Sequence, residues 1–84
     1  MSVEEINEIL WHYDPVELKD WGVPQEEYKF EAREIVKRLF GSEKSFDEVH
    51  DIVFTVFKET FGEIGGYKFQ YKVIAKKVFE LERN

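Results

Sequence analysis

The side chains best suited to chemistry are two histidines that each follow a carboxylate at helical spacing. Asp47 lies three positions before His50, and Glu8 lies four positions before His12. On helices, each carboxylate would share a face with an imidazole, and both groups are metal ligands. Such pairs form a site only when two of them converge from different helices, and a single pair is more often solvated helix surface. A metal-dependent enzyme built on His12 and His50 is therefore our third interpretation, and we expect no cofactor.

Nucleophilic catalysis lacks a suitable side chain. The sequence has no cysteine, and none of its three serines lies in the Gly-x-Ser-x-Gly turn of a hydrolase. Two of the serines, Ser2 and Ser45, precede predicted helices at capping positions. The glycine-rich segment 62–66 lacks the Gly-Lys-Ser/Thr of a phosphate-binding loop. We therefore expect no enzyme activity and assign no catalytic residue.

Charge is distributed unevenly along this acidic chain, whose net charge is −6. Residues 1–30 carry eight acidic and two basic side chains, whereas residues 61–84 carry three and five. An acidic first half repels phosphate, so we expect no nucleic-acid partner. A candidate acidic patch consists of Glu4, Glu5 and Glu8. A candidate basic stripe, which faces either these acids or solvent, consists of Lys68, Lys72 and Lys76.

Length and composition predict one small helical domain that spans residues 1–84. Aromatic residues make up 17% of the chain, which increases the area that so short a chain can bury. Abundant Glu and Lys with few thermolabile side chains is a thermophile-like composition. The first ten residues are acidic rather than basic, and no apolar run reaches the roughly 20 residues that span a bilayer. We therefore expect a cytoplasmic protein with no membrane partner.

Helical spacing of apolar residues predicts an all-α fold, a compact domain of four helices. The predicted helices span about 3–12, 24–40, 46–61 and 67–82. Ser2 with Glu5, and Ser45 with Glu48, form the capping boxes that start the first and third helices. Alternate apolar residues at 67–73 also fit a short strand.

The 14–22 linker is expected to contain an additional short helical turn at about 15–20. Asp14 would cap this turn, with Pro15 at its first position and Gly22 at its end. The linker and its flanks contain two tryptophans, two tyrosines and two prolines, which are residue types that a simple tether does not need. We therefore expect the linker to fold onto the body of the protein.

Four aromatic residues are candidates for a binding interface. Phe54 and Phe61 extend the apolar face of the helix at 46–61, which we expect to pack on two sides. Alternatively, this edge meets a partner or a second copy. Phe30 lies opposite the apolar face of its own helix. We expect the segment around Trp21 to cover it, and the alternative is that Phe30 is an exposed binding anchor.

The segment from Trp11 to Val36 resembles a known family. Its sequence is WHYDPVELKDWGVPQEEYKFEAREIV, with Asp-Pro, a glycine, Glu-Tyr and an acid-rich helix that contains Ile and Val. Over about residues 11–40 the chain resembles the YugE-like family of small bacterial all-α proteins of unknown function. This resemblance implies a compact helical protein and no known activity, and it carries over no site residue. From the residues alone, Asp14 can cap, and Tyr28 can pack its ring while its hydroxyl reaches a polar group.

These observations predict a non-enzymatic protein–protein interaction module, with another protein or a second copy in a homodimer as its partner. The reasons are a small acidic body, no catalytic constellation and more aromatic surface than one small core needs. The alternative is an acidic immunity-type or inhibitor protein that binds a basic toxin or nuclease, because an acidic patch accelerates the encounter with a basic site.

Overall fold

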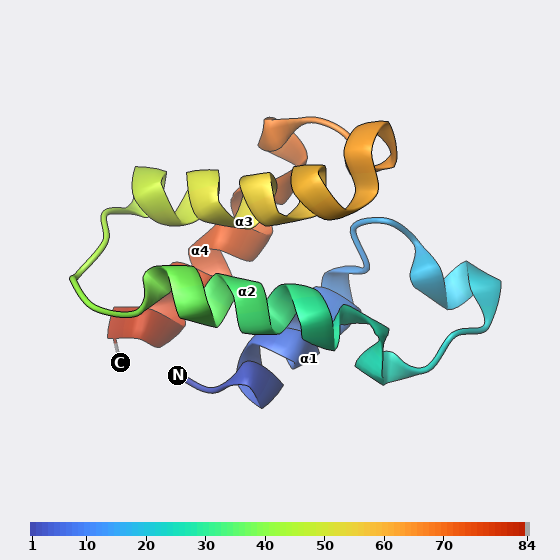
Figure 1. Ribbon diagram of the computed structural model, residues 1–84, viewed down its shortest axis with the longest axis horizontal. Coiled ribbons are helices and arrows are strands. Elements are labelled where there is room, and N and C mark those ends of the chain that lie inside the picture. The colour runs from blue at the N-terminus through green and yellow to red at the C-terminus, as the bar shows by residue number, and fades with distance from the viewer. Residues whose placement is uncertain (84) are drawn as a thin grey trace.

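Four α-helices joined by loops and short 3-10 helices form the protein in this computed structural model, which describes residues 1–83 (Figure 1). The α-helices are α1 (Val3–Tyr13), α2 (Lys29–Leu39), α3 (Phe46–Phe61) and α4 (Lys72–Arg83). The 3-10 helices are η1 (Leu18–Trp21), η2 (Gln25–Tyr28), η3 (Gly62–Gly65) and η4 (Lys68–Tyr71). No strand occurs within the described residues. The all-α prediction is therefore confirmed, and the alternative strand at 67–73 is wrong.

Capping boxes start α1 and α3, as predicted. The Glu5 N–H donates to Ser2 Oγ (3.1 Å), and the Ser2 N–H donates to Glu5 Oε1 (2.8 Å). Ser45 and Glu48 repeat this pair of bonds at 3.2 and 2.8 Å. Each box satisfies two backbone donors that a helix start would leave without partners, and such a cap contributes about 1 kcal/mol. The bond with Ser45 also lowers the pKa of the Glu48 carboxyl.

The chain reverses direction at Asp14 in a way that differs from the prediction. Asp14 has a left-handed φ of 47° and ends α1. The short helical turn starts at Leu18 rather than Pro15, and it ends at Gly22 as predicted. The Asp14 carboxylate still caps this turn, because the N–H groups of Leu18 and Lys19 donate to its oxygens. The predicted capping role was right, but the predicted start of the turn was wrong. Asp14 both ends one helix and caps the next.

The last predicted helix is divided in two. Gly66 has a φ of 80°, and Tyr67 after it is extended, so the helical path starts again at Lys68. η4 forms one 3-10 turn, in which the Tyr67 N–H donates to Gln70 Oε1 (2.6 Å), and α4 continues from Lys72. Tyr67 therefore lies outside the helix, and the predicted helix start at residue 67 was wrong.

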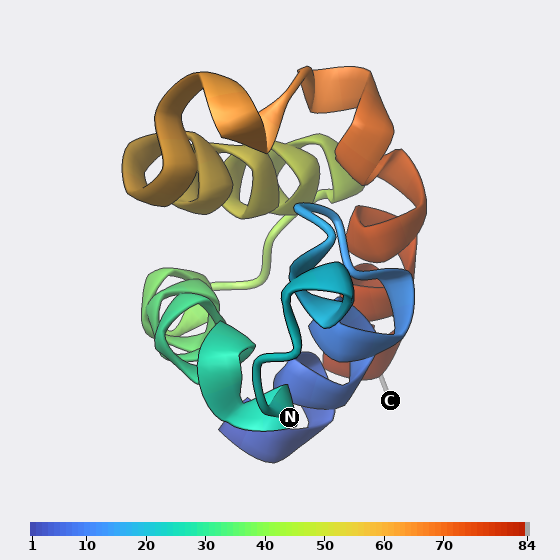
Figure 2. The ribbon, with the colours of Figure 1, turned by 90° about the vertical axis from the view of Figure 1, so that its right-hand side faces the viewer.

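The core lies between the four α-helices. α1 packs on α2, α2 on α3, α3 on α4, and α4 on α1 (Figures 1 and 2). Fully buried rings of Tyr28, Phe57 and Tyr71 fill its centre, with centroids 5.8 and 5.1 Å from that of Phe57. The aliphatic core residues are Ile6, Leu10, Val16, Ala32, Ile35, Leu39, Val49, Val53, Val56, Ile74, Ala75 and Val78. The radius of gyration, 11.8 Å, matches the roughly 12 Å of a folded chain of this length.

Within residues 1–83, no helix combines the length and the apolar character that crossing a bilayer requires.

Candidate binding surface

Asp14 and Tyr28 fasten the linker between α1 and α2 to the core. Tyr28 Oη donates to Asp14 Oδ1 (2.7 Å) and accepts from the Val16 N–H (3.2 Å). The same carboxylate accepts from the N–H groups of Leu18 (2.8 Å) and Lys19 (3.2 Å). Burial and the bond to Asp14 raise the pKa of the Tyr28 hydroxyl, so it remains a donor at neutral pH. The sequence-based expectation that Asp14 caps and that the Tyr28 hydroxyl reaches a polar group is confirmed.

The segment 14–27, here called the Trp21 loop, displays a tryptophan among acidic side chains. Trp21 is 79% exposed, although Val16 of the same loop is buried in the core. The exposed carboxylates of the loop belong to Glu17, Asp20, Glu26 and Glu27. Within residues 1–83, none of these four forms an ion pair. A loop that carries an exposed apolar ring and free carboxylates fits a surface that combines an apolar pocket with basic side chains.

Contacts within the Trp21 loop order it before any partner binds. Asp14 and Glu17 are both left-handed, with φ of 47° and 57°, a conformation that residues other than glycine rarely adopt. The Val16 N–H before Glu17 donates to Tyr28 Oη, and the Leu18 and Lys19 N–H groups after it donate to the Asp14 carboxylate, so the backbone is held on both sides of Glu17. The Lys19 ammonium also lies over the Trp11 ring, 5.2 Å from its centroid, and so ties η1 to α1. A loop that is ordered in advance loses less conformational entropy on binding.

Phe30 is not covered by the Trp21 loop, so that expectation was wrong. Phe30 is 57% exposed, and it lines a shallow groove between α2 and α3 with Arg38 and Glu59. Arg38 bridges the helices there, with Nη2 2.6 Å from Glu59 Oε1 and 3.4 Å from Glu34 Oε1. The residues that line this groove come from α2 and α3, whereas Tyr28 fastens the loop to Asp14 at the end of α1.

Phe54 and Phe61 are half-buried against the core. The Phe54 ring lies 5.9 Å from that of Tyr71, and Phe61 stacks on Phe57 at 5.7 Å. η3 and η4, which both contact α3, cover part of this edge. α3 therefore packs on more than one side, and only part of the Phe54/Phe61 edge is open to a partner.

A second exposed surface lies on η4 and the start of α4. This basic aromatic face consists of Tyr67, Lys68, Phe69, Lys72, Val73 and Lys76. Tyr67 and Phe69 are 71% and 73% exposed, and their rings are nearly parallel with centroids 6.1 Å apart. Lys68 Nζ lies 3.2 Å from Asp51 Oδ1, whereas Lys72 and Lys76 form no ion pair within residues 1–83. The predicted basic stripe thus faces solvent rather than the acids of α1.

Sequence reasoning found the lysines of this face but missed its apolar half, because Tyr67, Phe69 and Tyr71 do not share a side. Only Tyr71 turns inward, where its hydroxyl donates to the Gly65 carbonyl and burial raises its pKa to about 12. Gly65 lies so close to α3 that a Cβ there would be 3.1 Å from the Phe57 carbonyl oxygen. On a helical path, residues two positions away lie on nearly opposite sides, so an inward Tyr71 leaves Phe69 and Val73 facing outward.

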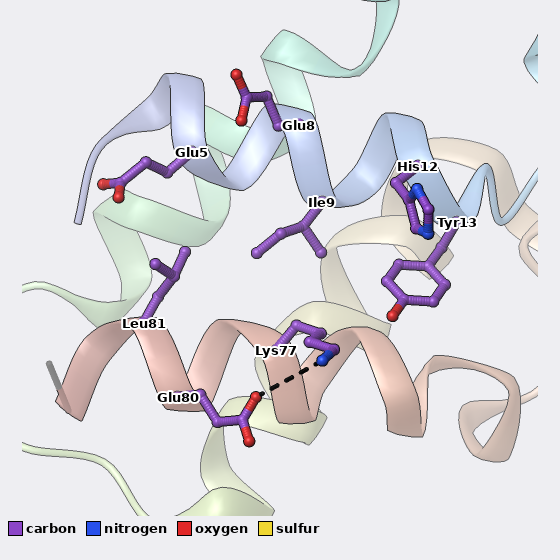
Figure 3. A pocket seen from close by; sticks show the side chains of 8 residues that line it. All are labelled: Glu5, Glu8, Ile9, His12, Tyr13, Lys77, Glu80 and Leu81. Atoms are coloured by element: carbon purple, nitrogen blue, oxygen red, sulfur yellow. Dashed lines mark ion pairs between the residues drawn. The ribbon is translucent and has the colours of Figure 1, made fainter.

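The predicted acidic patch borders a groove between α1 and α4 (Figure 3). Glu4, Glu5 and Glu8 are exposed on α1. Glu5 and Glu8 line the groove, which measures about 720 Å³ and also receives Lys77, 4.0 Å from Glu80. Its other lining side chains are Ile9, His12, Tyr13 and Leu81. All the polar side chains here are exposed, so the groove does not exclude water from any charged group.

The two histidines lie in different surroundings. His12 lies in the α1–α4 groove against Tyr13, with ring centroids 4.8 Å apart. His50 Nε2 lies 2.8 Å from the Lys68 carbonyl oxygen and so ties α3 to η4. Among the described residues, no group of three or more His, Cys, Asp or Glu side chains could hold a metal ion.

Glu31 is a buried carboxyl that no sequence pattern identified. It is 3% exposed, and its Oε1 has no hydrogen-bond partner within residues 1–83. Burial raises the pKa of this carboxyl, and the nearby charge of Glu27 raises it further. On the facing helix α1, Asn7 Oδ1 is also buried without a partner. Both atoms lie inside the α1–α2 contact and away from the exposed surfaces.

Comparisons with protein-family models, curated proteins and solved structures find no match for this chain. The resemblance to the YugE-like family therefore stays a prediction. Function has to be inferred from the chemistry of the surfaces described above.

Proposed function

We propose that this chain is a non-enzymatic protein–protein interaction module that binds its partner through the Trp21 loop. The observation that carries the proposal is a tryptophan 79% exposed on a loop held by four side-chain hydrogen bonds. Exposed tryptophans cost hydrophobic free energy in an isolated protein, and they are strongly enriched among the residues that dominate binding energy.

The surroundings of Trp21 indicate the chemistry of the partner. Free carboxylates of Glu17, Asp20, Glu26 and Glu27 surround it in sequence. Phosphate groups would be repelled, so a protein with a basic rim around an apolar pocket fits better than a nucleic acid. The net charge of −6, to which Glu4, Glu5 and Glu8 contribute, would steer such a partner from a distance.

The same loop favours an acidic immunity-type or inhibitor protein as the second candidate function. A basic toxin or nuclease exposes cationic side chains around its substrate site, and the carboxylates of the Trp21 loop would cover them. This candidate requires binding that weakens steeply as salt is added. The interaction-module proposal requires only a modest salt dependence, because burial of Trp21 rather than ion pairing would supply most of its binding energy.

The absence of enzyme activity is part of the proposal. The groove between α1 and α4 carries no buried titratable side chain, whereas general acid–base catalysis depends on groups whose pKa is shifted by their surroundings. Glu31 has such a shift, but it lies between helices where no substrate can reach it. A cytoplasmic location stays a prediction from the sequence.

Affinity capture from a lysate of the native host tests the proposal with a matched pair of variants. Trp21→Ala removes the proposed anchor, and Phe40→Ala removes an aromatic ring that is equally exposed, on the C-terminal end of α2. We expect one protein to bind wild type and Phe40→Ala in stoichiometric amount. Its measured affinity for Trp21→Ala should fall by roughly 30-fold or more.

A captured protein that binds Trp21→Ala as tightly as wild type would refute the role of the loop. Titrating the purified complex with salt separates the two candidate functions. A steep loss of affinity favours an inhibitor of a basic protein, and a small loss favours an apolar contact.

A further inference from the structure

We propose that the chain binds a second copy of itself, with the Trp21 loop of each protomer on the basic aromatic face of the other. This inference rests on the proposed function, because the same loop makes the contact. It adds the identity of the partner and a second binding surface, which no part of the proposed function requires.

The basic aromatic face has the chemistry that the Trp21 loop needs. Its apolar centre is formed by Tyr67, Phe69 and Val73, which are 71%, 73% and 53% exposed. Lys72 and Lys76 are exposed on α4, Lys72 next to Val73 in sequence and Lys76 one helical turn after it. An apolar patch of this kind with a charged border is the usual form of a protein–protein contact. Aromatic rings that are already stacked, as Tyr67 and Phe69 are, offer a flat surface for an indole.

The charges of the two surfaces are opposite and unpaired. The Trp21 loop has four free carboxylates, whereas Lys72 and Lys76 have no ion-pair partner within residues 1–83. Lys68 and Lys77 are already paired, with Asp51 and Glu80. Docking the loop on the face would therefore create ion pairs without breaking existing ones at Lys72 and Lys76.

The placement of the two surfaces allows a closed dimer. η1 lies at the right-hand end of the molecule in Figure 1, whereas η4 and the start of α4 lie near the middle of its upper side. Figure 2, viewed from the right-hand end, shows η1 in front and η3–η4 above it. A twofold axis between these two neighbouring sides would bring each loop to the other protomer's face, so both contacts would form at once.

Charge-reversal variants test the contact. Glu17→Lys with Asp20→Lys reverses two of the four free carboxylates of the loop, and Lys72→Glu with Lys76→Glu reverses the two unpaired lysines of the face. Sedimentation velocity over about 1 µM to 1 mM should show a wild-type monomer–dimer equilibrium that salt weakens. Each reversed variant alone should be monomeric, and Trp21→Ala should dimerise at least about 10-fold more weakly. An equimolar mixture of the two reversed variants should recover the dimer, because opposite charges then meet in both contacts.

A control separates this contact from general repulsion. Arg33→Glu with Lys37→Glu gives the same net charge as the reversed face, but it places the change on the exposed side of α2. This control should dimerise nearly as well as wild type.

The inference is overturned if wild type stays monomeric at every concentration, or if the mixture of reversed variants does not associate. Dimerisation unchanged in both reversed variants would also overturn it, because the contact would lie elsewhere. The proposed function fails separately, if a different captured protein binds Trp21→Ala as tightly as it binds wild type.

Discussion

Replacing Tyr28 with phenylalanine should strongly destabilise the protein, although it removes a single oxygen atom. Tyr28 Oη donates to the Asp14 carboxylate and accepts from the buried Val16 N–H. A hydrogen bond to a charged group contributes about 1.5–3 kcal/mol, and a buried N–H without a partner costs about 1–3 kcal/mol. Asp14 keeps its bonds from Leu18 and Lys19, which limits the loss on that side. We therefore expect the free energy of unfolding to fall by about 3 kcal/mol.

Chemical and thermal unfolding followed by circular dichroism measure this change. A loss of about 3 kcal/mol corresponds to a Tm lowered by roughly 12–24 °C in a domain of this size. The matched control is Tyr13→Phe, because Tyr13 is exposed and its hydroxyl makes no hydrogen bond within residues 1–83. That variant should lie within about 0.5 kcal/mol of wild type. If Tyr28→Phe also lies that close to wild type, the Asp14–Tyr28 contact does not fasten the loop and our reasoning is wrong.

Three further predictions concern single residues. Burial raises the pKa of Glu31, so the contribution of its protonated form to stability is full below the pKa of the unfolded chain and is lost as the pH rises through the folded pKa. Glu31→Gln should therefore be more stable than wild type at pH 7. In urea titrations this advantage should disappear near pH 3. Gly65→Ala should lower the free energy of unfolding by about 1–3 kcal/mol, because the new methyl group would lie 3.1 Å from the Phe57 carbonyl oxygen; an unchanged denaturation midpoint would contradict this. Ser45→Ala should cost about 1 kcal/mol through loss of the α3 cap, whereas Ser42→Ala, outside any helix start, should be neutral in the same assay.

The sequence predicted those features that depend on neighbouring residues. Ser2 and Ser45 marked the starts of two helices because a cap needs only a hydroxyl three positions before its carboxylate partner. The double role of Asp14 was not predictable, because its left-handed backbone is held by Tyr28, fourteen positions later. Local patterns identify which groups can bond, and tertiary contacts decide which conformation they bond in.

The candidate surfaces show the same limit. The lysines of the basic stripe could be found at a spacing of four, because exposed charge follows helical periodicity. Whether Phe69 or Tyr71 faced the core depended on the close approach of Gly65 to α3, which no local pattern encodes. The exposure of Phe30 likewise depended on where Tyr28 fastened the preceding loop.

The hydrogen bond between Asp14 and Tyr28 also affects how the protein unfolds locally. Peripheral loops usually fray independently and exchange their amide hydrogens quickly. Here the amides of Val16, Leu18 and Lys19 are held by a buried tyrosine and its carboxylate partner. They can be released only when the centre of the core opens, so loop and core form one cooperative unfolding unit. Slow hydrogen exchange at these amides, and tryptophan fluorescence that melts together with helicity, would be the signature of that unit.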